Sequence, residues 1–179
     1  MVRYIKGDIT KSDCNIICHQ VNCQGVMNSG VAKAIREKWP IVFQSYKAWC
    51  DRASNDTKVL MGKFQAIKVD GTTSKYVINL FTQQFYGYDG IRFTDYEAFY
   101  CALSDIRDDL KEYPRLTIAF PYKIGCVRGG ANWNIIKTMI EEVFAGRDVT
   151  FYYLNDDNLT WKEKLIVEEY NRKVPIDNE

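Results

Sequence analysis

Hydrophobic and polar positions change their spacing from segment to segment along the chain, and this spacing predicts the secondary structure. The segment "VRYIKGDI" at residues 2–9 alternates between apolar and polar positions, which indicates a strand. The segment "CNIICHQVN" at residues 14–22 is nearly continuously apolar, as is typical of a strand buried on both faces of a sheet. Residues 29–50 have helical spacing, and Pro40 is expected to divide them into two helices.

The alternation continues through the rest of the chain. Residues 62–84 predict two strands joined at the turn sequence "DGTT". A helix is expected to begin at Thr94, because Thr94 as N-cap and Glu97 three residues later have the pattern of a capping box. Strands that alternate with helices predict an α/β domain with helices on both faces of a largely parallel sheet. The remaining predicted strands are residues 115–122 and 148–154, and the remaining predicted helices are residues 132–147 and 160–174.

Composition and charge restrict the class of protein. The length of 179 residues fits one domain with a single substantial core. The net charge of +1 gives no attraction of the whole chain to nucleic acid or to acidic membranes, although a local basic patch remains open. No apolar run approaches the roughly 20 residues of a membrane span, and the N-terminus "MVRYIKGDIT" lacks the apolar region of a signal peptide. We therefore expect a cytoplasmic protein without a membrane partner.

The cysteines do not predict a metal site. Cys14, Cys18 and Cys23 lie close to His19, the only histidine, but their spacing does not match compact zinc sites and no second pair of ligands follows. The simpler interpretation is that they are small, buried and reduced side chains. No metal and no cofactor are expected.

Two glycine-containing loops follow predicted buried strands and lead into helices. The first glycine loop, "CQGVMNSG" at residues 23–30, follows the strand at 14–22; the second glycine loop, "IGCVRGGANW" at residues 124–133, follows the strand at 115–122. Glycines let a backbone approach a ligand closely, and the N–H groups at a helix N-terminus attract anions. Two such loops at the carboxyl ends of strands are suited to hold a pyrophosphate, although either loop alone is more simply explained as an ordinary tight turn. Neither loop matches the dinucleotide or P-loop motifs.

Four segments of the chain resemble the macrodomain family of ADP-ribose-binding modules. They are "KGDIT" at 6–10, "VNCQGVMNSGVAKAI" at 21–35, "FPYKIGCVRGGANW" at 120–133 and "VTFYYL" at 149–154. The resemblance is to the branch that contains the terminal ADP-ribose glycohydrolases and the yeast-type ADP-ribose-1''-phosphate phosphatases. It implies a three-layer α/β/α fold with a mixed, largely parallel sheet over residues 1–155, and a helical extension at 156–179 packed on the same domain.

The resemblance also implies roles for individual residues. Asp8 would accept a hydrogen bond from the adenine amino group, with Ile9 nearby, and Tyr152 would pack near the adenine or belong to the core. Asn22 would reach the distal ribose. The first glycine loop would contribute Gly30 and Val31 against the phosphates and distal ribose, and the second would cradle the phosphates through Gly125, Cys126, Val127, Gly129 and Gly130.

The chain departs from the family pattern at the positions of the known catalytic residues. The glycohydrolase branch has a lysine nucleophile where this chain has Gln83 and Gln84, and an aspartate where it has Gly129; an aspartate used by another hydrolase branch falls at Ala32. The yeast-type phosphatases, which this chain resembles, also have a histidine at the position of His19. His19 with Asn22 is therefore the predicted catalytic pair. A packed histidine is the alternative. An acid from the segment 85–97, Asp89 or Asp95, would assist, unless Asp95 only begins the helix.

The leading expectation is a hydrolase that removes phosphate from ADP-ribose 1''-phosphate. One alternative is the release of ADP-ribose from protein carboxylates or nucleic acid. Another is a non-catalytic reader of ADP-ribose. The expected partners are therefore ADP-ribose, its 1''-substituted derivatives and ADP-ribosylated macromolecules.

Overall fold

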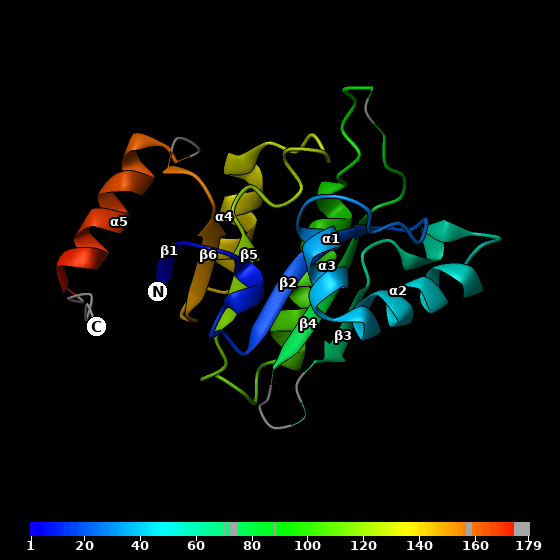
Figure 1. Cartoon of the computed structure of the whole chain (residues 1–179), viewed down its shortest axis with the longest axis horizontal. Helices are drawn as coiled ribbons and strands as arrows, with labels where there is room; N and C mark the ends of the chain where they lie inside the picture. Colours follow the sequence, from blue (N-terminus) through cyan, green and yellow to red (C-terminus); the bar gives the residue numbers. More distant parts are fainter. Residues whose placement is uncertain (70, 72–74, 88, 157–158, 174–179) are drawn as a thin grey trace.

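A six-stranded mixed sheet forms the centre of the protein (Figure 1). The computed structural model describes residues 1–69, 71, 75–87, 89–156 and 159–173, with no side-chain description for 170–173. The strand order is β1-β6-β5-β2-β4-β3, and every neighbouring pair is parallel except β3–β4. The predicted largely parallel sheet is thus confirmed. The strands are β1 (Val2–Lys6), β2 (Ile16–Asn22), β3 (Phe64–Lys68), β4 (Tyr76–Gln83), β5 (Ile118–Pro121) and β6 (Val149–Tyr153).

Helices cover both faces of the sheet, which confirms the three-layer α/β/α architecture. On one face, Ile35 and Val42, one from each of the first two helices, pack against Ile17 of β2. On the other face, α3 (Tyr96–Asp109) and α4 (Trp133–Val143) pack against Ile16 and Cys18 of the same strand. Because successive side chains of β2 point to opposite faces, its continuous apolar run fills both cores, as the sequence predicted. The helices are α1 (Gly30–Lys38), α2 (Pro40–Arg52), α3 (Tyr96–Asp109), α4 (Trp133–Val143) and α5 (Trp161–Lys173), with short 3-10 turns η1 (Ile9–Lys11) and η2 (Thr57–Leu60).

The last helix, α5, lies beside the edge strand β1 (Figure 1). Leu159, just before it, is buried in the core that α3 and α4 share, and Val167 packs against that core. None of the helices in the described ranges combines the length and apolar character needed to cross a membrane.

Local signals in the sequence were correct at one helix boundary and wrong at another. Pro40 stands at the first position of α2, where its missing N–H costs nothing, and α1 ends just before it. The predicted N-cap Thr94 is wrong: Asp95 caps α3, with its carboxylate accepting from the Ala98 N–H at 2.9 Å. Thr94 is instead buried and bonded elsewhere. Asp70, Thr72 and Thr73 of the predicted turn "DGTT" lie outside the described residues.

The direction in which successive strands are added to the sheet reverses between β2 and β5. From β2 the chain passes through α1 and α2 toward β3 and β4 on one side, whereas β5 and β6 lie on the other side. The loops after β2 and after β5 therefore lead to helices on opposite faces, α1 and α4. Adjacent parallel strands whose loops diverge in this way leave a crevice at their carboxyl ends, where ligands bind in open α/β sheets.

Candidate functional site

A cleft of about 540 Å³ lies at this divergence of the two loops. Its volume falls within the range typical of small-molecule sites. Both glycine loops line it, together with the ends of β2, β4 and β5. The lining residues are His19, Gln20, Val21, Asn22, Val26, Met27, Asn28, Ser29, Gly30, Val31, Ala32, Gln83, Tyr86, Gly87, Pro121, Tyr122, Lys123, Ile124, Gly125, Val127, Arg128 and Gly129.

Asn22 organises the first glycine loop. Its Oδ1 accepts from the Gln24 N–H at 2.9 Å and from the Tyr46 hydroxyl at 2.8 Å, and its Nδ2 donates to the Val26 carbonyl at 2.7 Å. The side chain is buried. Asn22 therefore holds the loop in shape, and within the described residues the second N–H of its amide has no acceptor and lies at the cleft lining.

The N-terminus of α1 opens onto the cleft. Ser29, Gly30, Val31 and Ala32 all line it, and the side chain of the N-cap residue Ser29 makes no capping hydrogen bond. The first N–H groups of a helix have no acceptor within the helix and lie at the positive end of its dipole. This end of the cleft is therefore suited to an anionic group.

The second glycine loop packs closely against Thr94. The Thr94 hydroxyl donates to the Gly125 carbonyl at 2.8 Å, and the Thr94 N–H donates to the Gly129 carbonyl at 2.9 Å. Gln20 Nε2 donates to the same hydroxyl at 3.0 Å. A Cβ atom on Gly129 would overlap with Thr94 Oγ1 and with the Gly125 oxygen. Position 129 thus requires glycine, and an aspartate does not fit there.

The charge of the cleft is positive. Lys123 and Arg128 are its charged lining residues, and within the described ranges no carboxylate joins them. Lys123 has a left-handed φ of +57°, a conformation that lysine rarely adopts, at the sharp turn just after β5. Cationic side chains combined with helix N–H groups favour a ligand with negative charge.

His19 is fixed by a chain of amides. The Ser45 carbonyl can only accept, so Gln65 Nε2 donates to it at 3.1 Å. Gln65 Oε1 then accepts from Asn79 Nδ2 at 3.0 Å. Asn79 Oδ1 must in turn accept from His19 Nε2 at 2.6 Å. This order places the ring proton on Nε2 and leaves Nδ1 as an acceptor, buried and without a hydrogen-bond partner among the described residues.

Burial determines the protonation state of His19. The side chain is 1% exposed. Removal from water lowers the pKa of His19 to about 4, and the hydrogen bond with Asn79 only partly opposes this shift. His19 is therefore neutral at pH 7, so it is not an imidazolium that donates a proton there.

The predicted adenine-binding residues lie to one side of the cleft, at the carboxyl ends of β1 and β6. Asp8 is exposed and caps η1, its Oδ1 accepting from the Thr10 N–H and hydroxyl, each at 2.9 Å. Ile9 is buried, and Tyr152 and Val31 pack against the cluster that contains it. Since Val31 lines the cleft, this cluster connects the two regions.

The other predicted residues divide between the cleft and its supports. Gly30, Gly125, Val127 and Gly129 line the cleft, and Val127 is 86% exposed at its edge. Cys126 and Gly130 are not part of the lining: the Cys126 thiol donates to the Ile124 carbonyl, and the Gly130 N–H donates to the Cys126 carbonyl. Burial raises the pKa of the Cys126 thiol to about 11.

The two candidate acids differ in their surroundings. The Asp95 carboxylate is occupied as the cap of α3. Asp89 is exposed, and its Oδ1 lies beside Gly87, which lines the cleft. Gln83, at the place of the family lysine, lines the cleft and donates to the Phe85 carbonyl at 3.0 Å. The described residues bring together no group of three or more His, Cys, Asp or Glu side chains that would hold a metal ion.

Sequence reasoning missed several residues of the site. Lys123 and Arg128 flank the glycines of "YKIGCVRGG", so the position of basic residues beside the loop was a usable signal. The interaction of Gln20 with Thr94, 74 residues later in the chain, had no local signal.

Comparison with known proteins gives one consistent family. The Macro domain family model matches residues 18–140. The "ADP-ribose 1''-phosphate phosphatase" of Scheffersomyces stipitis is 30% identical over 133 residues, which cover 65% of this chain and 74% of that protein. The "DNA ADP-ribosyl glycohydrolase" of Mycobacterium bovis is 27% identical over 148 residues, 80% of this chain but only 39% of that protein. The solved structure "Thermosipho africanus DarTG in complex with ADP-ribose" superimposes with a TM-score of 0.72 at 18% identity, over 93% of this chain and 45% of that one.

Proposed function

Since the chain belongs to the Macro domain family, we propose that it binds ADP-ribose and removes phosphate from ADP-ribose 1''-phosphate. One observation carries the proposal. Two glycine loops meet at one cleft with a helix N-terminus and two cationic residues, and no carboxylate is among its described lining residues. These are the features that a diphosphate requires.

In this proposal the ligand extends along the carboxyl ends of the parallel strands. The diphosphate binds between the α1 N-terminus and the second glycine loop, whose shape depends on Cys126 and Gly130. The adenine binds toward Asp8, Ile9 and Tyr152. The distal ribose and its 1''-substituent bind toward Asn22 and the end of β2, above His19.

Hydrolysis of the phosphate ester transfers the phosphoryl group to water and leaves a hydroxyl at the 1'' position. We assign to the Asp89 carboxylate the removal of a proton from the attacking water and its return to the leaving 1'' oxygen, because Asp89 lies beside the cleft residue Gly87 and is not occupied as a helix cap. Neutral His19 assists this hydrolysis in one of two ways: its Nδ1 lone pair accepts a hydrogen bond, or its packing fixes the position of the end of β2.

Release of ADP-ribose from nucleic acid is the second candidate, because the Mycobacterium bovis relative is named for this activity. We rank it lower because a lysine–aspartate route lacks both residues at the family positions. Gln83 cannot form a Schiff base, and Thr94 leaves no space for a side chain at position 129.

Product assays separate these activities. The pure protein is incubated with ADP-ribose 1''-phosphate and, separately, with ADP-ribosylated DNA and ADP-ribosylated protein. Release of inorganic phosphate that falls about 100-fold or more in Asp89→Asn supports the proposal. Release of ADP-ribose from a macromolecule without phosphate release would favour the second candidate. Tight binding of ADP-ribose with no turnover of any substrate would identify a reader.

Binding of the adenine is tested at Asp8. Its Oδ1 caps η1, and no hydrogen bond within the described residues uses Oδ2. Asp8→Asn keeps an oxygen for the cap but directs an N–H₂ group at the adenine amino group. We expect calorimetry to show a Kd for ADP-ribose about tenfold higher, with little change in stability. Unchanged affinity would place the adenine elsewhere.

A further inference from the structure

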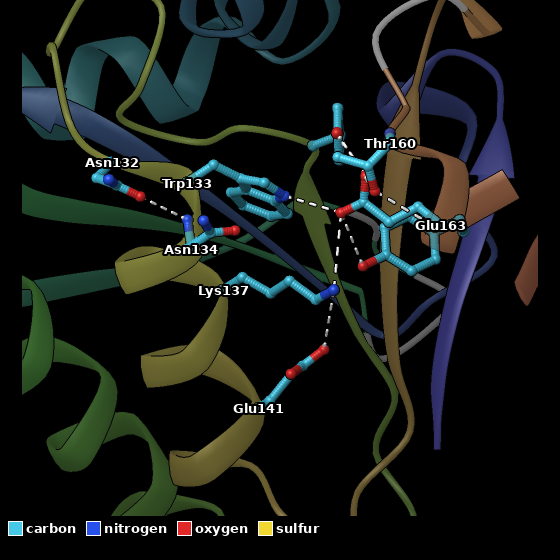
Figure 2. A network of polar contacts seen from close by, with 9 residues as sticks. Asn132, Trp133, Asn134, Lys137, Glu141, Thr160 and Glu163 are labelled. Carbon is cyan, nitrogen blue, oxygen red and sulfur yellow. Dashed lines mark hydrogen bonds and ion pairs between the residues drawn. The ribbon is translucent and has the colours of Figure 1, made fainter.

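The carboxylate of Glu163 in α5 is a buried charge, 2% exposed. Its Oε1 accepts from Trp133 Nε1 at 3.0 Å and lies 3.7 Å from the Lys137 ammonium (Figure 2). The Tyr4 hydroxyl is 3.5 Å from the same oxygen. Its Oε2 accepts from the Tyr122 hydroxyl at 2.8 Å.

Glu163 also completes the start of its own helix. The Thr160 N–H and hydroxyl donate to Oε2 at 2.9 and 2.8 Å, and the Glu163 N–H lies 3.4 Å from Thr160 Oγ1. This is a capping box. Burial raises the pKa of Glu163, but the hydrogen bonds, led by that of Trp133, outweigh it and lower the pKa to about 2. The carboxylate is thus charged at neutral pH and has donors on both oxygens.

Two of these donors stand at the two ends of the second glycine loop. Tyr122 directly follows β5 and lines the cleft, and Trp133 is both the last residue of the loop and the first of α4. Their rings also meet edge to face, with centroids 4.9 Å apart. Between them lies Lys123 with its left-handed backbone, a strained conformation that persists only where the surrounding structure holds it.

We infer that Glu163 is a positioning residue that joins both ends of the second glycine loop, so that α5 helps to build the cleft. A capping box alone needs only Thr160 and leaves the glutamate at the surface. Here the side chain reaches β5 and α4 as well. The inference rests on the proposed function only in taking ADP-ribose as the ligand.

Hydrogen–deuterium exchange tests the inference without a ligand. The N–H groups of Ile124, Cys126, Gly130 and Ala131 donate to backbone carbonyls within or just before the loop, so their exchange reports on its opening. Glu163→Gln keeps the shape but replaces one acceptor with an N–H₂ group facing donors. We expect these amides to exchange about tenfold faster, with β2 unchanged, and the Kd for ADP-ribose to rise about tenfold.

Three further variants make the result specific. Tyr122→Phe and Trp133→Phe each remove one donor, and each is expected to accelerate exchange in the loop. Phe144→Leu is the control: it lowers the stability of the same hydrophobic core, in which Phe144 packs on Phe120, without removing a donor to Glu163. At a temperature where it remains folded, it should leave both loop exchange and the Kd unchanged.

The outcomes separate the two proposals. If the wild type does not bind ADP-ribose, the proposed function fails, and exchange still decides the role of Glu163. Unchanged loop exchange in Glu163→Gln overturns the inference. Should that variant not fold, unchanged exchange in both Tyr122→Phe and Trp133→Phe overturns it instead.

Discussion

The tautomer of His19 is set by residues that are distant from it in the chain, and its neutral charge by burial. Asn79, 60 residues away, accepts a hydrogen bond from the His19 Nε2–H through its Oδ1, and Gln65 orients Asn79. Among hydrophobic and amide neighbours the imidazolium would lose its hydration without gaining an opposite charge. A neutral ring with a fixed tautomer is therefore the state that folding favours.

This state makes stability depend on pH. The pKa of His19 is about 4 in the folded protein and 6.5 for an ordinary histidine, so the unfolded chain binds a proton first as the pH falls. The stabilisation is complete above pH 6.5 and is lost as the pH falls toward 4. Between pH 7 and pH 5 the wild type should lose about 2 kcal/mol more than His19→Gln in urea unfolding. Equal losses in the two proteins would contradict a buried neutral histidine.

At the scale of elements, the second glycine loop is held by the segment that precedes α3. Thr94 donates to Gly125 and accepts from Gln20, while the Phe93 N–H donates to the Gly129 carbonyl at 2.9 Å. Because Thr94 makes these bonds, capping passes to its neighbour Asp95. A capping motif describes only the local chain, and the loop that competed for Thr94 comes about 30 residues later.

The close packing at Gly129 predicts a large effect of one methyl group. In Gly129→Ala, the Cβ would overlap with Thr94 and with backbone oxygen, so the free energy of unfolding should fall by about 2 kcal/mol. Gly71→Ala is a matched control, because a Cβ there meets no atom of the described residues within 4 Å. That control should stay within about 0.5 kcal/mol of wild type in urea unfolding. If both variants are equally stable, the loop can shift to accommodate the added Cβ, which would contradict the prediction.

At the scale of the whole molecule, residues after 155 contribute to the main core. Leu159 is buried with α3 and α4, and Glu163 binds Trp133 and Tyr122. A chain that ends at residue 155 exposes these surfaces to water. Its thermal midpoint should fall by about 10 °C or more, as measured by calorimetry. Leu159→Ala tests the apolar contribution alone, and it should lower the free energy of unfolding by about 2–3 kcal/mol. A truncated chain as stable as the wild type would make α5 an independent appendage.

Local patterns in the sequence were sufficient for the elements and their order. The apolar run of β2, the break at Pro40 and the glycine loops after β2 and β5 are properties of neighbouring residues, so they can be recognised without the fold. The capping box at Thr160 and Glu163 was visible in "TWKE" as well, although its buried partners were not. The alternation of strands and helices then limits the architecture to few choices.

The partners that these residues contact in space depend on the tertiary structure. The sequence predicted that two glycine loops follow buried strands; the strand order, with β2 next to β5, brings them to one cleft. It also determined that there is a single histidine, whereas burial beside Asn79 decided its charge. The physical reason is that hydrogen bonding and desolvation depend on partners in space, and those partners lie up to 159 residues apart in the chain, as Tyr4 and Glu163 do.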